Sequence, residues 1–268
     1  MDVFGKDAVI GDFRLSDHGL YLSTFNPENT NDLGMTHNTE EQFVGKNPVP
    51  VYLGSVYGAK LSMQMTVIQD ECKTHKIYFT QNEIREILGR LTGYQGYKKM
   101  YIKDEKNLEN IYYNVRVTNV SEEYLNEEVV ALTFSMECDS QFAWCDKQTV
   151  YVTSNNDEMI RVYCNTDDRY NYLLPKIIIK PISDVEDYSI TNMNDNNRAV
   201  VIDEISAGEV VTMDSKLKTI RSSNPARNYS YGFNYKFLQL VNGENRLVIS
   251  HPSSITLSMM LPRKVGIM

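Results

Sequence analysis

The stretch TFSMECDSQFAWC, residues 133–145, decides how this chain is divided. Its first part alternates apolar and polar residues as far as Cys138, which is the pattern of a strand with one buried face. The chain then turns polar and reaches Phe142 and Trp144, the only tryptophan among 268 residues. Because a buried tryptophan covers roughly 200 Å² of surface, we expect a domain to end here with Phe142 and Trp144 at the domain seam. The alternative is that Trp144 belongs wholly to the core of the first domain.

Upstream of this stretch, hydrophobic patterning predicts antiparallel strands. Residues 110–120 and 128–138 have strand-like composition and are joined by the acidic connector SEEYLNEE, so they predict a hairpin. Residues 59–68 alternate in the same way, with Met63 among the apolar positions, and predict a half-buried strand. Cys138 lies on the apolar face of its strand, where it is expected to act as a small buried hydrophobe.

One helix is predicted at residues 81–92, QNEIREILGRLT. Thr80 and Glu83 have the spacing of a capping box, and Gly93 is expected to take the left-handed conformation after the last turn. Gly89, inside the pattern, should cost about 1 kcal/mol of helix stability relative to alanine unless close packing requires it. The apolar stripe of the helix consists of Ile84, Ile87, Leu88 and Leu91.

Downstream of Trp144 the chain contains many short β-rich runs bounded by Asn, Asp, Gly or Pro, which indicates a β-sandwich or jelly roll. Residues 237–250, FLQLVNGENRLVIS, place two apolar runs around an Asn-Gly pair and predict a hairpin. The sequence therefore predicts a mainly β protein. Its domains are expected at 1–146, with the single helix, and at 147–268.

Composition excludes several function classes. The formal net charge of −8 argues against a surface that collects phosphates, so no specific nucleic-acid binding is expected. No segment approaches the roughly 20 consecutive apolar residues of a membrane-spanning helix, and the start of the chain has no continuous apolar run typical of a signal peptide. The four cysteines form no CxxC and are expected to be reduced thiols.

No catalytic constellation is apparent in the sequence. The chain contains no GxSxG, GxGxxG, GxxxxGK[ST] or HExxH, and the four histidines are scattered. The acidic pairs at 157–158, 167–168 and 186–187 could serve glycoside hydrolysis, but such doublets are far more often solvated turns. NMNDNNR at 192–198 fails the spacing of a calcium loop and is better explained as a turn. We therefore predict no catalytic residue, metal or cofactor.

The eighteen tyrosines raise the question of sugar binding, because aromatic rings stack on the apolar faces of sugars. The best candidate is NYSYGFNY at 228–235, where Tyr229, Tyr231 and Tyr235 are contact candidates for a glycan or protein. The competing interpretation, which we favour, is a strand whose alternating aromatics are buried against a sheet.

The order of these parts resembles the distal tail proteins of long-tailed bacteriophages. The likeness spans most of the chain and is carried by the strand that precedes Phe142-Ala143-Trp144, the helix EIREILGRL and the segment FNYKFLQLVNGENRLVIS. Family members often have proline before the first aromatic residue, where this chain has Gln141.

The resemblance implies a β-sandwich or split-barrel domain with one helix, followed by a galectin-like or jelly-roll sandwich. It implies a structural, non-enzymatic virion protein at the tail tip that is present in the host cytoplasm during assembly. The expected assembly is a homohexameric ring that joins the tail tube protein to a tail-tip hub protein, with a receptor-binding protein or a host cell-wall saccharide as further partners. The polar segment 26–47 is then a candidate ring contact, with Asn26, Asn31, Asp32 and His37 as its candidate residues. The alternative function is a stand-alone glycan-binding module.

Overall fold

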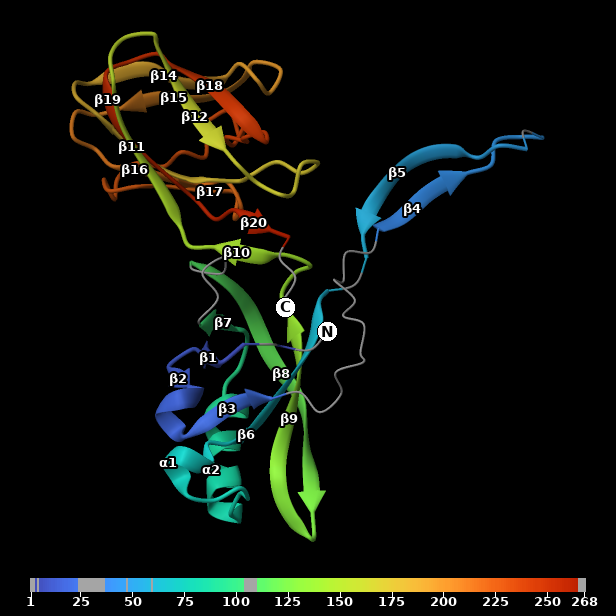
Figure 1. The fold of residues 1–268 in the computed structure, drawn as a ribbon. Helices are drawn as coiled ribbons and strands as arrows, with labels where there is room; N and C mark the ends of the chain where they lie inside the picture. The colour runs from blue at the N-terminus through green and yellow to red at the C-terminus, as the bar shows by residue number, and fades with distance from the viewer. Residues whose placement is uncertain are drawn as a thin grey trace. The chain divides into compact units, whose positions relative to one another are not determined.

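The computed structural model describes residues 3, 5–23, 37–46, 48–58, 60–103 and 110–264. They belong to two compact units, the first reaching Trp144 and the second running from Cys145 to Arg263, while Lys264 groups with the first. Strands dominate both units, which confirms the prediction of a mainly β protein. The second unit is shown in yellow to red in Figure 1.

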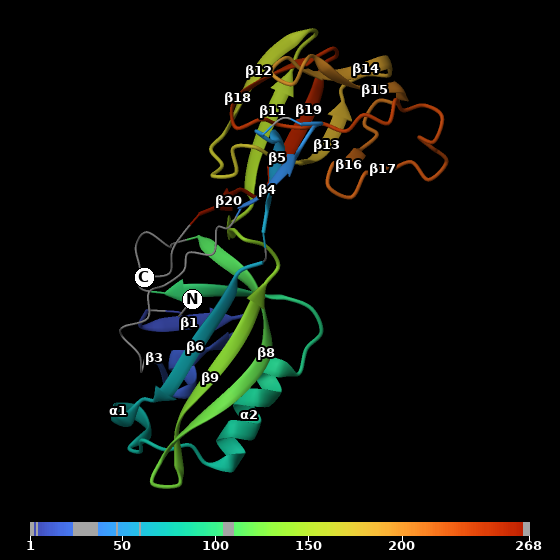
Figure 2. The same cartoon turned by 90° about the vertical axis from the view of Figure 1, so that its right-hand side faces the viewer.

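The first unit is built on one antiparallel sheet in the strand order β2-β1-β7-β8-β9-β6-β3. Two helices accompany it, and Figure 2 shows α2 beside β8. The elements are β1 (Asp7–Ile10), β2 (Phe13–Arg14), the 3₁₀ helix η1 (Leu15–His18), β3 (Leu20–Ser23), β4 (His37–Gln42), β5 (Val51–Tyr57), β6 (Ser62–Gln69), α1 (Glu71–Thr74), α2 (Gln81–Thr92), β7 (Lys98–Lys103), β8 (Ile111–Leu125), β9 (Glu128–Cys138) and β10 (Ala143–Cys145).

The predicted β8–β9 hairpin is confirmed, but its turn is shorter than the sequence indicated. Strand β8 continues through the first five of the eight residues of the acidic connector, and the turn consists of Asn126 and Glu127 alone. Both turn residues have positive φ, 49° and 68°, a conformation that matches the twist of a two-residue hairpin. The acidic residues therefore lie at an exposed end of the hairpin, where water solvates their charges.

The core of the first unit contains the apolar positions that strand alternation predicted. In β6 the side chains of Met63, Met65 and Val67 are buried, while Ser62 and Gln64 are exposed. Cys138 is completely buried in the same core, and burial raises the pKa of its thiol to about 12. This confirms that Cys138 is a packing residue rather than a reactive thiol.

Helix α2 begins at its predicted capping box. Thr80 Oγ1 accepts from the backbone N–H of Glu83 at 3.5 Å, and Glu83 Oε2 accepts from the N–H of Thr80 at 2.8 Å. The prediction for Gly93 is wrong, because its φ is −74°. Glycine is required there for a different reason: a Cβ atom at residue 93 would lie 2.4 Å from the carbonyl oxygen of Gly89.

Gly89→Ala is expected to stabilise the first unit by about 1 kcal/mol, since a Cβ atom at residue 89 meets nothing within 4 Å and alanine restricts the unfolded chain. Urea unfolding followed by the fluorescence of Trp144 measures the change. Gly93→Ala, the matched control, should destabilise the unit because of the clash with the carbonyl of Gly89. Equal effects of the two substitutions would contradict the prediction.

The second unit is a sandwich of two antiparallel sheets. A five-stranded sheet has the order β11-β19-β13-β16-β17, and a four-stranded sheet has the order β12-β18-β14-β15. The core between them is aliphatic and aromatic, with Ile177 and Leu257 from one sheet and Ile190 and Leu247 from the other. The elements are β11 (Gln148–Ser154), β12 (Glu158–Cys164), β13 (Lys176–Pro181), β14 (Val185–Asn192), β15 (Arg198–Ile205), β16 (Val211–Asp214), β17 (Thr219–Ser222), β18 (Gly243–Ile249), β19 (Ser253–Met259) and β20 (Pro262–Arg263).

The hairpin predicted around Asn242-Gly243 is wrong. Strand β18 begins at Gly243 and pairs with β12 and β14, while residues 237–239 form no strand. The turn is closed by a side chain: Asn245 Oδ1 accepts from the N–H of Val241, and Asn245 Nδ2 donates to the carbonyl of Val241, both at 2.8 Å. The preceding segment therefore makes no local ladder with β18.

Candidate functional site

Strands β4 and β5 form a two-stranded hairpin that pairs with no other strand in the described parts of the chain. Its apolar side chains are exposed. Because neighbouring strand residues point to opposite faces, three consecutive exposed apolar residues in β5 leave neither face of the hairpin buried. The exposed apolar residues of β5 and of the segment before it are Phe43, Val44, Val49, Val51, Tyr52, Leu53 and Val56.

Such a hairpin requires contacts beyond its own strands. An isolated pair of strands is at best marginally stable in water, and its free edges present unpaired backbone groups to any other strand. Scattered exposed apolar residues are ordinary on protein surfaces, but seven gathered on one short ribbon form a surface suited to association. We name residues 37–57 the arm.

The end of the arm nearest the sheet packs on Phe142. The rings of Tyr57 and Phe142 meet edge to face with centroids 4.9 Å apart, and Lys264 Nζ lies 5.9 Å from the centroid of the Phe142 ring. Phe142 is buried, whereas Trp144 is half-buried and donates from Nε1 to Asp139 Oδ1 at 3.1 Å. All of these contacts lie in the first unit, and a role of Phe142 and Trp144 between the domains stays a prediction.

One of the four residues predicted for the ring contact is described by the structure. Asn26, Asn31 and Asp32 lie outside the described residues. His37 is the first residue of β4. The polar segment 26–47 is therefore not a loop throughout, because residues 37–42 form a strand that pairs with β5. Sequence reasoning missed this strand and the apolar strand opposite it, although the run VPVYLGSVY at 49–57 is rich in residues that favour strands.

The aromatic cluster 228–235 is a loop rather than the predicted strand. Tyr229 is buried and donates from its hydroxyl to Glu209 Oε1 at 2.7 Å, which removes its ring from the surface. Tyr231 is 94% exposed, and Tyr235, with φ of 56°, is also exposed and donates to the carbonyl of Ser230. The three tyrosines therefore share no face, and only Tyr231 and Tyr235 are accessible to a ligand.

The side chains that could bind a metal ion or react with a substrate are dispersed among the described residues. No three His, Cys, Asp or Glu side chains gather there in an arrangement that could hold a metal ion. In the NMNDNNR segment, Asp195 is buried and pairs with Arg198 at 2.8 Å, so this carboxylate serves the β14–β15 turn. All four cysteines are free, and burial raises the pKa of the Cys164 thiol to about 11. No helix among the described residues is long and apolar enough to cross a membrane.

Two β units, and an arm with exposed apolar residues whose strands pair with no other strand of the described residues, are features of a subunit that assembles with other chains. The chain belongs to the phage tail proteins. Residues 4–140 match the family described as phage tail protein N-terminal domain, and residues 142–259 match the family described as phage tail C-terminal domain. None of the curated proteins matches the chain.

The fold is shared with the Dit protein of phage SPP1 (gp 19.1), described as a paradigm of the hub adsorption apparatus in phages that infect Gram-positive bacteria. The TM-score is 0.68 with 11% sequence identity, and the alignment covers 95% of this chain and 98% of that protein. At this identity the likeness concerns the fold. Family and fold together confirm the resemblance to distal tail proteins that the sequence indicated.

Proposed function

We propose that this protein is a structural, non-enzymatic subunit of the phage tail tip that assembles as a closed homohexameric ring through the arm. The arm of one subunit packs on the neighbouring subunit, so that its apolar residues are buried and its strand edges are paired. The ring joins the tail tube protein to a tail-tip hub protein. The second unit carries further tail-tip partners, a receptor-binding protein among them.

The observation that carries this proposal is the exposure of the arm. A surface of this kind in a lone subunit favours aggregation, whereas a cyclic assembly buries each arm in an identical way and leaves none free. The likeness to Dit, a protein described as part of a hub apparatus, agrees with a ring at the end of a tube. Residues 1–146 form the ring in this proposal, and residues 147–268 form the peripheral domain.

The substitution Leu53→Glu tests the proposal, since it places a charge on the apolar surface of the arm. We expect the purified protein to form six-subunit rings by mass photometry and negative-stain microscopy, and Leu53→Glu to be monomeric with an unchanged circular dichroism spectrum. The matched control is Ile182→Glu, because Ile182 is 65% exposed in the second unit and Leu53 is 60% exposed in the arm. Rings that survive Leu53→Glu, or a wild-type protein that stays monomeric in the presence of a tail tube protein, would overturn the proposal.

The alternative of a stand-alone glycan-binding module keeps one supporting observation, the exposed ring of Tyr231. It predicts that Tyr231→Ala or Tyr235→Ala weakens sugar binding while the fold remains intact. A monomer that binds a glycan through these rings would favour this module over the ring subunit.

A further inference from the structure

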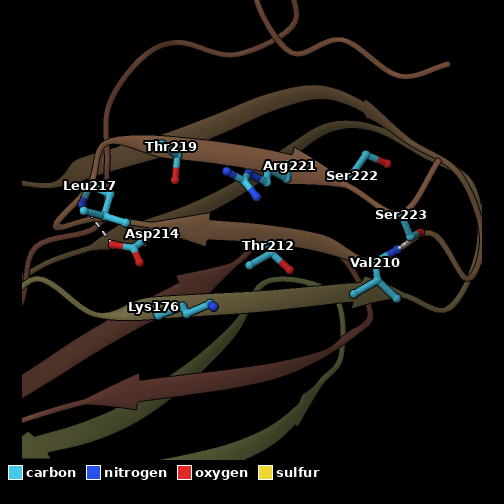
Figure 3. Close-up of a pocket in the computed structure, with 9 residues that line it drawn as sticks. All are labelled: Lys176, Val210, Thr212, Asp214, Leu217, Thr219, Arg221, Ser222 and Ser223. Carbon is cyan, nitrogen blue, oxygen red and sulfur yellow. Dashed lines mark hydrogen bonds between the residues drawn. The ribbon is translucent and has the colours of Figure 1, made fainter. Parts of the chain in front are cut away.

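The outer face of the five-stranded sheet is hollowed over β13, β16 and β17. The hollow has a volume of about 430 Å³, and it is open to solvent rather than enclosed. Figure 3 shows Thr212 beside Arg221 on β16 and β17, and Lys176 on the neighbouring strand β13, next to Asp214. The remaining lining residues are Val210, Asp214, Leu217, Thr219, Ser222 and Ser223.

Strand register extends this hollow into a hydroxyl-rich face. Thr212 pairs with Arg221 on one side and with Ile178 on the other, so that one cross-sheet row starts in the hollow and crosses all five strands. A second, neighbouring row also crosses all five strands and includes Lys176. The first row consists of Tyr151, Thr256, Ile178, Thr212 and Arg221, and the second of Thr149, Ser258, Lys176, Asp214 and Thr219.

The charge in the hollow is positive although the chain carries a formal net charge of −8. Lys176 and Arg221 are exposed and form no salt bridge with a carboxylate of the described residues. The only carboxylate in the lining is Asp214, and its Oδ1 already accepts from the backbone N–H groups of Lys216 and Leu217, at 3.0 and 2.9 Å. The two cations therefore keep their hydrogen-bond donors available to a ligand.

We propose that this hollow binds an anionic saccharide, a sugar chain that carries carboxylate or phosphate groups. Arg221 presents a planar fork of donors that matches either anion, and Lys176 adds a second charge two strands away. The hydroxyls of Thr212, on the strand between them, and of Thr219, on the strand of Arg221, can both donate to and accept from sugar hydroxyls. The volume lies in the range of about 300–1,000 Å³ that is usual for small-ligand sites.

A saccharide fits this surface better than a protein partner does. The buried centre of a protein interface is usually apolar and aromatic, with charged residues depleted. The lining here is mostly hydroxyl and charged groups, and Leu217 is its only exposed large apolar side chain. Tyr151, 79% exposed at the far end of the first row, supplies a ring on which a longer sugar chain can stack. The inference goes beyond the ring-forming role and does not depend on it.

Calorimetric titration of the full chain tests the proposal with four probes: an oligogalacturonate, a phosphorylated oligomannoside, maltohexaose and polyglutamate. We expect one or both anionic saccharides to bind more tightly than neutral maltohexaose and acidic polyglutamate. Arg221→Ala and Lys176→Ala should each weaken that binding about tenfold or more, because each removes a charge-assisted contact. Arg221→Lys should give an intermediate affinity, since it keeps the charge and loses the fork.

Lys236→Ala is the matched control, because Lys236 is an exposed lysine of the same unit that does not line the hollow. It removes the same charge and should leave the affinity unchanged. The proposal is overturned if neither anionic saccharide binds at millimolar concentration, or if polyglutamate binds as well as they do. Loss of binding in Tyr231→Ala together with full binding in Arg221→Ala would also overturn it, and would assign the sugar contact to the 228–235 loop. Failure of ring formation leaves each of these readouts intact.

Discussion

Replacing Asn245 with alanine is expected to lower the free energy of unfolding of the second unit by about 3 kcal/mol. Asn245 is completely buried and closes the turn before β18 with two hydrogen bonds to the backbone of Val241. Its Oδ1 also accepts from Asn192 Nδ2 at 3.0 Å, and Asn192 is itself buried. Alanine would leave the N–H and the carbonyl of half-buried Val241 without these partners, and Asn192 Nδ2 would keep only its bond to the carbonyl of Gln239. A buried polar group left unpaired costs about 1–3 kcal/mol.

Hydrogen exchange followed by mass spectrometry measures this loss, because the amide of Val241 depends on the Asn245 side chain for its protection. Exchange in the peptide that contains Val241 should accelerate about a hundredfold, the equivalent of roughly 3 kcal/mol. Asn242→Ala is the control from the same turn. Asn242 is exposed, and its Oδ1 accepts one bond from the N–H of Thr166 at 3.2 Å, so its loss should cost about 1 kcal/mol or less. Equal costs for the two asparagines would contradict the prediction.

The difference between Asn242 and Asn245 explains why the hairpin prediction was wrong. An Asn-Gly pair between apolar runs is a strong local signal for a two-residue turn. Here the strand after it pairs with β12 and β14, which come from much earlier in the chain, and a buried amide replaces the local ladder. Local patterns carry no information about which distant strand is the partner. The same limit applies to residues 228–235, where aromatic spacing by two predicted a strand and the structure has a loop.

Elements whose stability is local were predictable. Helix α2 has its capping box and its buried Ile84, Ile87 and Leu91 as expected, and β6 and β9 have the buried face that alternation indicated. The arm was not predicted, since its exposed apolar residues follow no alternation with a buried face. The hollow was not predicted either, because Lys176 and Arg221 are brought to the same face of one sheet only by the pairing of β13, β16 and β17.

The buried carboxylate of Glu209 is the centre of a hydrogen-bond network near β16 and β17 of the second unit. Glu209 is buried, and its carboxylate accepts from the hydroxyls of Ser222 and Tyr229 and from the N–H of Ser206. Arg227 lies 3.5 Å from Glu209 Oε2 and 2.9 Å from Glu204 Oε2. Burial alone would raise the pKa of Glu209, but these hydrogen bonds and the charge of Arg227 outweigh it and hold the pKa below its ordinary value of 4.5.

Glu209→Gln is therefore expected to destabilise the protein by about 3 kcal/mol at pH 7, because it removes the negative charge beside Arg227 and replaces Oε2, which accepts from the N–H of Ser206, with a donor. A folded-state pKa below 4.5 means that the unfolded chain binds the proton more readily, so the contribution of Glu209 is complete above about pH 4.5 and is lost as the pH falls through the lower, folded-state value. The difference between wild type and Glu209→Gln in urea unfolding should accordingly shrink on acidification below about pH 4.5. Glu204→Gln is the control on the same arginine: the Glu204 side chain is 63% exposed, against 2% for Glu209, and its loss should cost under about 1 kcal/mol. A difference between wild type and Glu209→Gln that stays constant from neutral pH down to pH 3 would show that the charge of Glu209 has no part in stability.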